Sequence, residues 1–332
     1  MNYRALAISG VKYLAGMPAP VSVGCVLTHR CNLHCEYCNF PGNLTEEMTT
    51  EEWKGAIDEF TRAGTIRFGF TGGEALLRED APELLRHAKR TGATTTLCSN
   101  GILVPERIDE LDGLDIYTTS LDGANAEIHD AQRRSRGNFE KAIRGIELAL
   151  SAGKQVKTLT VLTPRNLDEV PGILDLADEM GFEAGFQPAS NASLASPEAP
   201  SLAPEAAKFH EVGEFLAGAL KEGRNLLSSK TSVEHMLHYP EGEGGDLCWA
   251  AGKYFCYIDP AGAVFPCHFV YHPEPGAHPS GKELGYVNAF RECRSCADSC
   301  PGCYIVPYNE MNNLFRLSPS TLWKQVRSAL SW

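Results

Sequence analysis

The sequence lacks the features that would place the protein in a membrane or on a nucleic acid. Its 332 residues contain no apolar run long enough to cross a bilayer and no cleavable signal peptide, which predicts a cytoplasmic chain. Basic residues are in deficit, with 30 Lys and Arg against 42 Asp and Glu and a formal charge of −12. Proteins that follow a nucleic-acid backbone need a basic surface, so no nucleic-acid partner is expected.

Cysteine, by contrast, is plentiful, and its distribution is uneven. There are 12 cysteines, and reduced thiols in the cytoplasm favour metal binding over disulfides. Three lie in the segment "CNLHCEYC", at Cys31, Cys35 and Cys38. A second group lies near the C-terminus and consists of Cys248, Cys256, Cys267, Cys293, Cys296, Cys300 and Cys303. Structural zinc takes four ligands and disulfides take pairs, so three thiols in one loop suit a metal centre with one open position.

Residues 21–188 alternate between strand-like runs and helical patterns. The expected strands are Val21–Thr28, Ile66–Phe70, Thr94–Cys98, Asp115–Ser120, Val156–Leu162 and Glu183–Gln187. Repeated strand–helix units predict a parallel sheet with helices packed outside it. Six units fall short of the eight that close a barrel, so we expect an α/β fold, a partial (β/α)6 TIM-like barrel with an open side.

Unusual sequences follow four of these strands. "CNLHCEYC" follows the first, "TGGEALL" (71–77) the second and "SNG" (99–101) the third, and "SLDG" (120–123) ends the fourth. Each alone is typical of a turn. Because chemistry in such folds gathers at the carboxyl ends of the strands, four such segments on one rim predict an active site there.

The three-cysteine motif followed by Gly-Gly-Glu resembles the radical S-adenosylmethionine (radical SAM) superfamily over residues 21–188. The resemblance implies that Cys31, Cys35 and Cys38 hold a [4Fe–4S] cluster whose fourth iron binds S-adenosylmethionine. One electron then splits the sulfonium into methionine and a 5′-deoxyadenosyl radical, which takes a hydrogen atom from the substrate. A reductase such as flavodoxin or ferredoxin is the expected electron donor.

The same resemblance assigns roles around the cofactor. Gly72, Gly73 and Glu74 are expected to hold the methionine amino group, since glycine lets the backbone approach closely. Ser120 is expected to contact the bound cofactor.

Three further positions complete the expected cofactor site. Arg133, in "HDAQRR", resembles the arginine that pairs with the methionine carboxylate, and Arg134 is the alternative. Tyr37 matches an aromatic position near the adenine. Asn100 is a second candidate for contact with that part of the cofactor.

The C-terminal cysteines resemble the auxiliary-cluster domains named SPASM and Twitch. An Ala/Ser/Pro-rich linker and bridging helices are expected over 189–246, followed by the auxiliary domain over 247–332. The spacing of Cys248, Gly262 and Cys267 fits the opening of such domains, and the run up to Cys267 is typical of a hairpin.

One auxiliary [4Fe–4S] cluster is therefore expected, with the ligands Cys248, Cys267, Cys293 and Cys296. The spacing after Cys296 departs from the full SPASM pattern, so a second cluster on Cys256, Cys300 and Cys303 is left open. Zinc is the alternative metal, because paired cysteines also build zinc ribbons.

Two further predictions concern the N-terminal helix and the end of the sixth strand. Residues 1–20 hold an amphipathic helix, predicted to pack against the barrel, with contact to a membrane surface as the alternative. Gln187 ends the sixth strand and is predicted to face the substrate in the barrel mouth.

We therefore expect a radical SAM oxidoreductase that oxidises or crosslinks an organic substrate. Only 20 residues precede the first strand, which leaves no room for a leader-binding domain and favours a non-peptide small molecule. The alternative is maturation of a ribosomally made peptide. A non-catalytic scaffold holding structural zinc is the more distant one.

Overall fold

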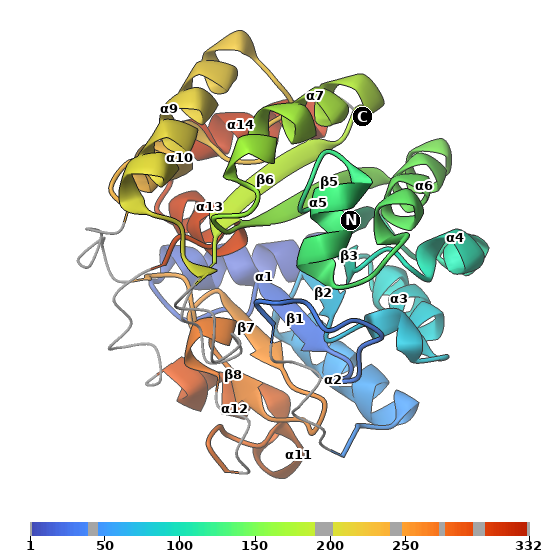
Figure 1. The fold of residues 1–332 in the computed structure, drawn as a ribbon. Helices are drawn as coiled ribbons and strands as arrows, with labels where there is room; N and C mark the ends of the chain where they lie inside the picture. The colour runs from blue at the N-terminus through green and yellow to red at the C-terminus, as the bar shows by residue number, and fades with distance from the viewer. Residues whose placement is uncertain are drawn as a thin grey trace.

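The structure is a computed structural model that describes residues 2–38, 46–189, 202–239, 248–271, 276–294 and 303–330. It is an α/β fold built on one eight-stranded sheet, in the order β6-β5-β4-β3-β2-β1-β7-β8 (Figure 1). All neighbouring strands run parallel except β7 and β8, which pair antiparallel. Cys296 and Cys300, two of the expected ligands, lie outside the described residues.

The first six strands confirm the predicted alternation. The strands are β1 (Ser22–Val26), β2 (Arg67–Thr71), β3 (Thr94–Ser99), β4 (Ile116–Ser120), β5 (Gln155–Leu162), β6 (Glu183–Pro188), β7 (Phe255–Ile258) and β8 (Val264–Phe265). The helices are α1 (Tyr3–Leu14), α2 (Thr50–Ala63), α3 (Ala81–Arg90), α4 (Val104–Arg107), α5 (Ala126–Arg133), α6 (Asn138–Ser151), α7 (Val170–Met180), α9 (Ala206–Glu222), α10 (Lys230–Met236), α11 (Gly281–Leu284), α12 (Tyr286–Cys293), α13 (Val306–Phe315) and α14 (Pro319–Leu330).

Side chains alternate between the two faces of the sheet. On β2, Phe68 and Phe70 are fully buried in the core between sheet and helices, with Trp53 and Phe60 of α2. Arg67 and Thr71, on the same strand, instead line a cavity on the inner face. This alternation follows from the two-residue period of a strand, and it leaves the inner face free for a ligand.

Helix α1 packs on the barrel, as predicted. Ser9 Oγ donates to the Gly64 carbonyl at 2.6 Å, and Lys12 Nζ donates to the Ala63 carbonyl at 2.9 Å. These bonds use carbonyls that the end of α2 leaves without helical partners. Over the described part of the chain, no helix is long and apolar enough to cross a membrane.

The predicted hairpin forms, and it joins the barrel sheet. Gly262, with φ of 96°, turns the chain between β7 and β8. Strand β7 then pairs parallel with β1, Ser22 opposite Phe255, so the C-terminal segment extends the same sheet (Figure 1). The edge of β1 is thereby covered instead of being left with unpaired backbone groups.

Helix α13 closes the inner face from the other side. Its Tyr308, Met311 and Leu314 line the cavity together with residues of all six barrel strands. Tyr13 Oη of α1 donates to the Phe315 carbonyl at 2.8 Å and so ties α13 to the N-terminal helix. The open side of the barrel is thus covered by the C-terminal part of the chain.

Candidate functional site

The loops after β1 and β2 are joined backbone to backbone. Gly73 N donates to the Thr28 carbonyl at 2.9 Å, and Glu74 N donates to the Arg30 carbonyl at 2.8 Å. A Cβ at Gly72 would lie 2.3 Å from the Thr28 oxygen, and one at Gly73 would lie 2.4 Å from the Arg30 oxygen. Only glycine permits this approach, which fixes the segment leading to the rim cysteines, Cys31, Cys35 and Cys38, against the Gly-Gly-Glu turn.

Glu74 connects this pair of loops to the loop after β3. Its side chain is fully buried, and its Oε2 accepts from Asn100 N at 2.8 Å and Ser99 Oγ at 3.1 Å, while Oε1 accepts from Leu76 N at 3.0 Å. Burial raises the pKa of Glu74, and these hydrogen bonds oppose the rise. Glu74 therefore links three successive rim segments, through its backbone N–H to Arg30 and through its carboxylate to Ser99 and Asn100.

Asn100 reaches back to the cysteine loop. Its Nδ2 lies 2.7 Å from Asn32 Oδ1 and 3.8 Å from Cys31 Sγ. Burial raises the pKa of the Cys31 thiol, and the contact with Asn100 acts in the opposite direction. The structure therefore places Asn100 beside a rim cysteine.

Arg133 forms a buried ion pair at the other end of the cysteine loop. Its Nε lies 2.7 Å from Asp122 Oδ2, and the side chains are 8% and 0% exposed. Tyr37 Oη donates to the same oxygen at 2.8 Å, and the guanidinium lies over the Tyr37 ring at 5.6 Å. Arg133 Nη1 also donates to Cys35 Sγ at 3.4 Å. Burial alone would lower the pKa of Arg133, but Asp122 raises it well above its ordinary value, so the positive charge beside Cys35 is permanent.

Asp122 is one of the site residues that the sequence did not indicate. It belongs to "SLDG", and Val161 N donates to its Oδ1 at 3.0 Å. Arg134, the alternative to Arg133, is 52% exposed and lies 3.9 Å from Glu36. Ser120 is half-buried at the end of β4. The structure thus brings Arg133 against a rim cysteine and leaves Arg134 at the surface.

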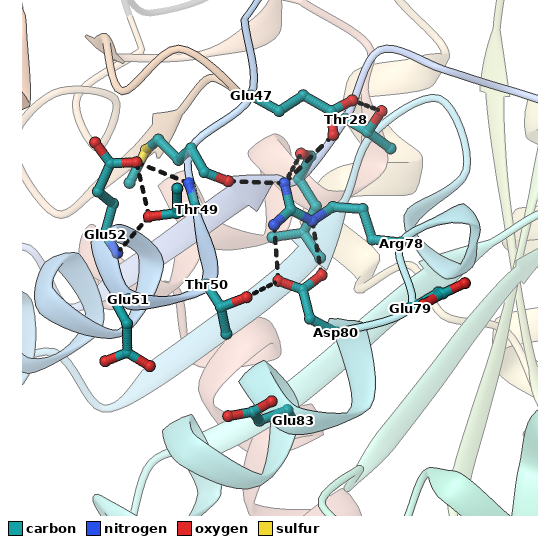
Figure 2. A network of polar contacts seen from close by, with 12 residues as sticks. Thr28, Glu47, Thr49, Thr50, Glu51, Glu52, Arg78, Glu79, Asp80 and Glu83 are labelled. Carbon is teal, nitrogen blue, oxygen red and sulfur yellow. Dashed lines mark hydrogen bonds and ion pairs between the residues drawn. The ribbon is translucent and has the colours of Figure 1, made fainter.

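Arg78 anchors both ends of the segment that carries the rim cysteines. The guanidinium is 8% exposed and donates to Asp80 at 2.9 and 2.7 Å, to the Met48 carbonyl at 2.9 Å and to Glu47 at 3.4 Å (Figure 2). Glu47 in turn accepts from Thr28, three residues before Cys31. Both ends of the segment, Thr28 and Glu47–Met48, are therefore held by one hydrogen-bond network. That network is centred on Arg78, which follows the Gly-Gly-Glu turn.

A cavity of about 370 Å³ lies inside the barrel. It extends along the inner face of β2 from Arg67 to Thr71, and Gln187 of β6 lines it, as expected for a residue facing the barrel interior. Gln187 Oε1 accepts from Val306 N of α13 at 3.3 Å. Tyr257, His268 and Tyr308 form the side of the cavity that the C-terminal segment contributes.

The described C-terminal cysteines fall into two apolar clusters. Cys248, Cys267 and Cys303 pack with Tyr254, Phe255 and their neighbours. Cys256 and Cys293 lie fully buried in the main core. Cys256 and Cys293 thus belong to a different apolar cluster from Cys248, Cys267 and Cys303. Within the described residues, no three His, Cys, Asp or Glu side chains are grouped closely enough for one metal ion.

The rim fits an iron–sulfur cluster with bound S-adenosylmethionine in three respects. One loop supplies three thiols, the number that leaves an iron open, although in the structure they are not drawn together around one centre. The guanidinium of Arg133 provides positive charge next to the Cys35 sulfur. At Gly72 and Gly73 a Cβ would collide with the backbone of the loop after β1, so these glycines let the Gly-Gly-Glu turn lie directly against the segment that carries the cysteines.

The fold and the site define a class of protein, a metal-dependent enzyme built on an open parallel barrel. Comparisons with known proteins agree with this class. The family described as "Radical SAM superfamily" matches residues 25–177. Mycofactocin maturase MftC of Mycolicibacterium smegmatis is 30% identical, over 87% of this chain and 76% of that protein. AdoMet-dependent heme synthase of Methanosarcina barkeri is 29% identical, over 76% and 78%. PqqA peptide cyclase of Ruegeria pomeroyi is 29% identical, over 86% and 80%.

Among solved structures, SuiB of Streptococcus suis has the same fold. Its S-adenosylmethionine complex superposes with a TM-score of 0.61 at 15% identity, covering 79% of this chain and 63% of that one. Its complex with the precursor peptide SuiA gives 0.60 at 15% identity, covering 89% and 69%.

The chain belongs to the radical SAM superfamily, in the SPASM-type group of its relatives, and it is an enzyme. The family binds a [4Fe–4S] cluster and S-adenosylmethionine. The cysteine-rich C-terminal region fits an auxiliary domain, in agreement with the predicted fold class.

The prediction that favoured a small-molecule substrate is wrong. It rested on the short segment before the first strand, yet PqqA peptide cyclase aligns with 86% of this chain and SuiB is seen with a precursor peptide. The length of the chain before the barrel carries no information about the substrate, because a substrate can be recognised by other surfaces or by a separate protein.

Proposed function

We propose that this radical SAM enzyme oxidises or crosslinks a ribosomally made peptide that enters the barrel cavity. The observation that carries the proposal is the cavity itself. It extends from Thr71, next to the rim, to Tyr257 and Tyr308, which pack in the same apolar cluster as Cys267. A side chain bound there would lie between the two cysteine groups. The names of two relatives, the peptide cyclase and the maturase, support a peptide as the substrate.

At the rim, we assign Cys31, Cys35 and Cys38 to the [4Fe–4S] cluster. When bound, the cluster and S-adenosylmethionine supply a 5′-deoxyadenosyl radical by one-electron cleavage of the sulfonium. Gly72 and Gly73 are assigned to the methionine amino group, and they let the Gly-Gly-Glu turn lie against the cysteine loop.

The surrounding side chains hold that rim in place. Glu74 and Asn100 fix the loops around the cofactor site, and Arg133 keeps a positive charge next to Cys35. Tyr37 and Ser120 are assigned to the edge of the cofactor site.

At the C-terminal end, we assign one auxiliary [4Fe–4S] cluster to the group formed by Cys248, Cys267, Cys293 and Cys296. Cys248 and Cys267 pack in one apolar cluster, which supports their shared role. Burial excludes water from a centre of this kind and affects its potential. Its position next to the cavity wall suits a centre that accepts an electron from a substrate radical, as a net oxidation requires.

The test is a product search with the full chain, reconstituted anaerobically with iron and sulfide. S-adenosylmethionine, a strong reductant and short peptides encoded beside the gene are added, and 5′-deoxyadenosine and peptide masses are followed by mass spectrometry. We expect formation of 5′-deoxyadenosine to accompany loss of two hydrogen atoms from one peptide. The variant with all three rim cysteines changed to Ala is the matched control. If 5′-deoxyadenosine accompanies turnover of a tetrapyrrole and of no peptide, the peptide assignment is wrong.

A further inference from the structure

Charged side chains gather at one end of the cavity. Arg67 begins β2, Glu183 begins β6, Lys157 lies near the start of β5, and Lys324 reaches in from α14. We call these four residues the floor group. The rest of the inner face of the barrel strands carries small or uncharged residues, namely Ser22, Gly24, Gly69, Thr71, Thr96, Cys98, Thr118, Leu159 and Gln187.

Within the floor group, the lysines are paired and the arginine is not. Glu183 lies 3.4 Å from Lys157 Nζ and 3.3 Å from Lys324 Nζ, one lysine on each carboxylate oxygen. Arg67 has no hydrogen bond or ion pair from its side chain to any residue that the structure describes. A guanidinium carries five N–H donors in a planar fork, so Arg67 presents its whole binding capacity to the cavity.

The balance of charge around the cavity is positive. The lining contains three cationic side chains and two carboxylates, Glu183 and Glu310. Ser229 N donates to Glu310 Oε1 at 2.7 Å, and Glu310 Oε2 is buried without a hydrogen bond to a residue that the structure describes. Burial lowers the pKa of Lys157 and Arg67 lowers it further, so the two cations feel one another across the floor. An anion bound by Arg67 would relieve this repulsion.

We propose that Arg67, with Lys157 and Lys324 beside it, is a subsite for a carboxylate of the substrate at the floor of the barrel cavity. The proposal rests on the proposed function in taking that carboxylate from a peptide, either from its C-terminus or from an acidic side chain. A planar carboxylate matches the guanidinium fork with two parallel hydrogen bonds.

The strand also sets a distance between this subsite and the rim. From Arg67 to Thr71 there are four residue steps, about 13 Å at roughly 3.3 Å per residue of strand. A peptide held by its carboxylate at the floor therefore presents to the radical a position about four extended residues away from that carboxylate.

Cys98 provides a reporter inside the same cavity that needs no substrate. Its thiol lines the cavity, and Arg67 lies close enough to lower its pKa, although burial raises that pKa to about 11. Iodoacetate and iodoacetamide both alkylate a thiolate by displacing iodide, but only iodoacetate carries a carboxylate. The ratio of the two rates at Cys98 cancels the fraction of thiolate and reports the attraction of the site for an anion.

We expect Arg67→Gln to lower the iodoacetate-to-iodoacetamide ratio at Cys98 by roughly tenfold, measured by mass spectrometry of the holoenzyme at mildly alkaline pH. Arg67→Lys should retain part of the preference because it keeps the charge. Arg62→Gln removes a neighbouring arginine that is exposed outside the cavity, and it should leave the ratio unchanged. An equal ratio in wild type and Arg67→Gln would overturn the subsite.

The peptide part of the proposal is tested separately, with a peptide that supports turnover. We expect either C-terminal amidation or one Asp→Asn or Glu→Gln change in the peptide to raise KM about tenfold in the wild type and to have little effect in Arg67→Gln. The position of the sensitive group identifies the source of the carboxylate. If none of these changes raises KM, the substrate carboxylate is refuted. Since the alkylation ratio requires no turnover, a failure of the proposed peptide chemistry leaves that first result intact and is told apart from a failure of the subsite.

Discussion

The buried pair of Arg133 and Asp122 allows a quantitative test of how the rim is built. Asp122→Asn keeps the shape of the side chain and removes its charge. Arg133, 8% exposed, then becomes a buried cation without its partner at 2.7 Å. Breaking a buried ion pair by removing one partner costs about 3–5 kcal/mol, but the amide oxygen can keep the hydrogen bond from Val161 N, and the NH2 group can donate to Tyr37 Oη. We therefore expect a loss near the lower end, about 3 kcal/mol of the free energy of unfolding.

The measurement is urea unfolding of the holoenzyme in a double-mutant cycle with Arg133→Gln. Each single change leaves one buried charge alone, whereas the double variant removes both, so the double variant should lose about 2 kcal/mol less than the sum of the two single changes. Glu147→Gln is the matched control, because its pair with Arg144 is 49% and 60% exposed and should be worth less than about 1 kcal/mol. If the two single losses add within about 0.5 kcal/mol, the two charges are not coupled and this account of the rim fails.

Three further outcomes are expected. Replacing the three rim cysteines by Ala should remove about four iron atoms per chain and abolish 5′-deoxyadenosine formation, while iron bound by the C-terminal cysteines remains; unchanged iron content would contradict the assignment. Gly73→Ala should weaken S-adenosylmethionine binding at least tenfold in equilibrium dialysis, because the added Cβ would meet the Arg30 carbonyl oxygen at 2.4 Å. The control is Gly55→Ala on the open face of α2, which should raise the free energy of unfolding by about 1 kcal/mol and leave binding intact. Burial opposes ionisation of Asp80, but hydrogen bonds from Arg78 lower its pKa below the ordinary value. The carboxylate of Asp80 is therefore protonated at lower pH in the native state than in the unfolded state. The stabilisation of the native state by the Arg78–Asp80 pair is complete above about pH 4 and is lost as the pH falls through the pKa of Asp80 in the folded protein. Asp80→Asn should flatten unfolding free energy against pH in this acid range, and an unaltered slope would refute the role of the pair.

The parts of the fold that could be predicted from sequence are those set by local patterns. Thr49 and Glu52 form a capping box at the start of α2, and Gly64 ends that helix with φ of 115°. The hairpin around Gly262 also forms at its predicted turn. In each case the signal lies within a few neighbouring residues, where propensity and turn chemistry act directly.

Other features depend on contacts between distant segments, and no local pattern predicts those. The pairing of β7 with β1 joins residues more than two hundred positions apart, and a hairpin gives no sign of which edge it will cover. The role of Asp122 could not be predicted because Asp-Gly at the end of a strand is typical of a turn. Helix α5 was not predicted, although it is the element that delivers Arg133 to the cysteine loop.

The position of β1 explains how one cavity can adjoin both cysteine groups. Strand β1 leads directly into the rim loop, while β7, paired along its other edge, leads into the hairpin that ends at Cys267. Gly24 on β1 has no side chain, and a Cβ there would meet the Tyr257 ring at 2.1 Å, so the ring from β7 covers that part of the cavity wall. The same ring packs 4.3 Å from His268, the residue after Cys267. A substrate bound as proposed would be bordered by the end of β2, next to the rim, and along one side by an aromatic wall that leads to Cys267, an arrangement that would suit the proposed hydrogen abstraction followed by electron transfer.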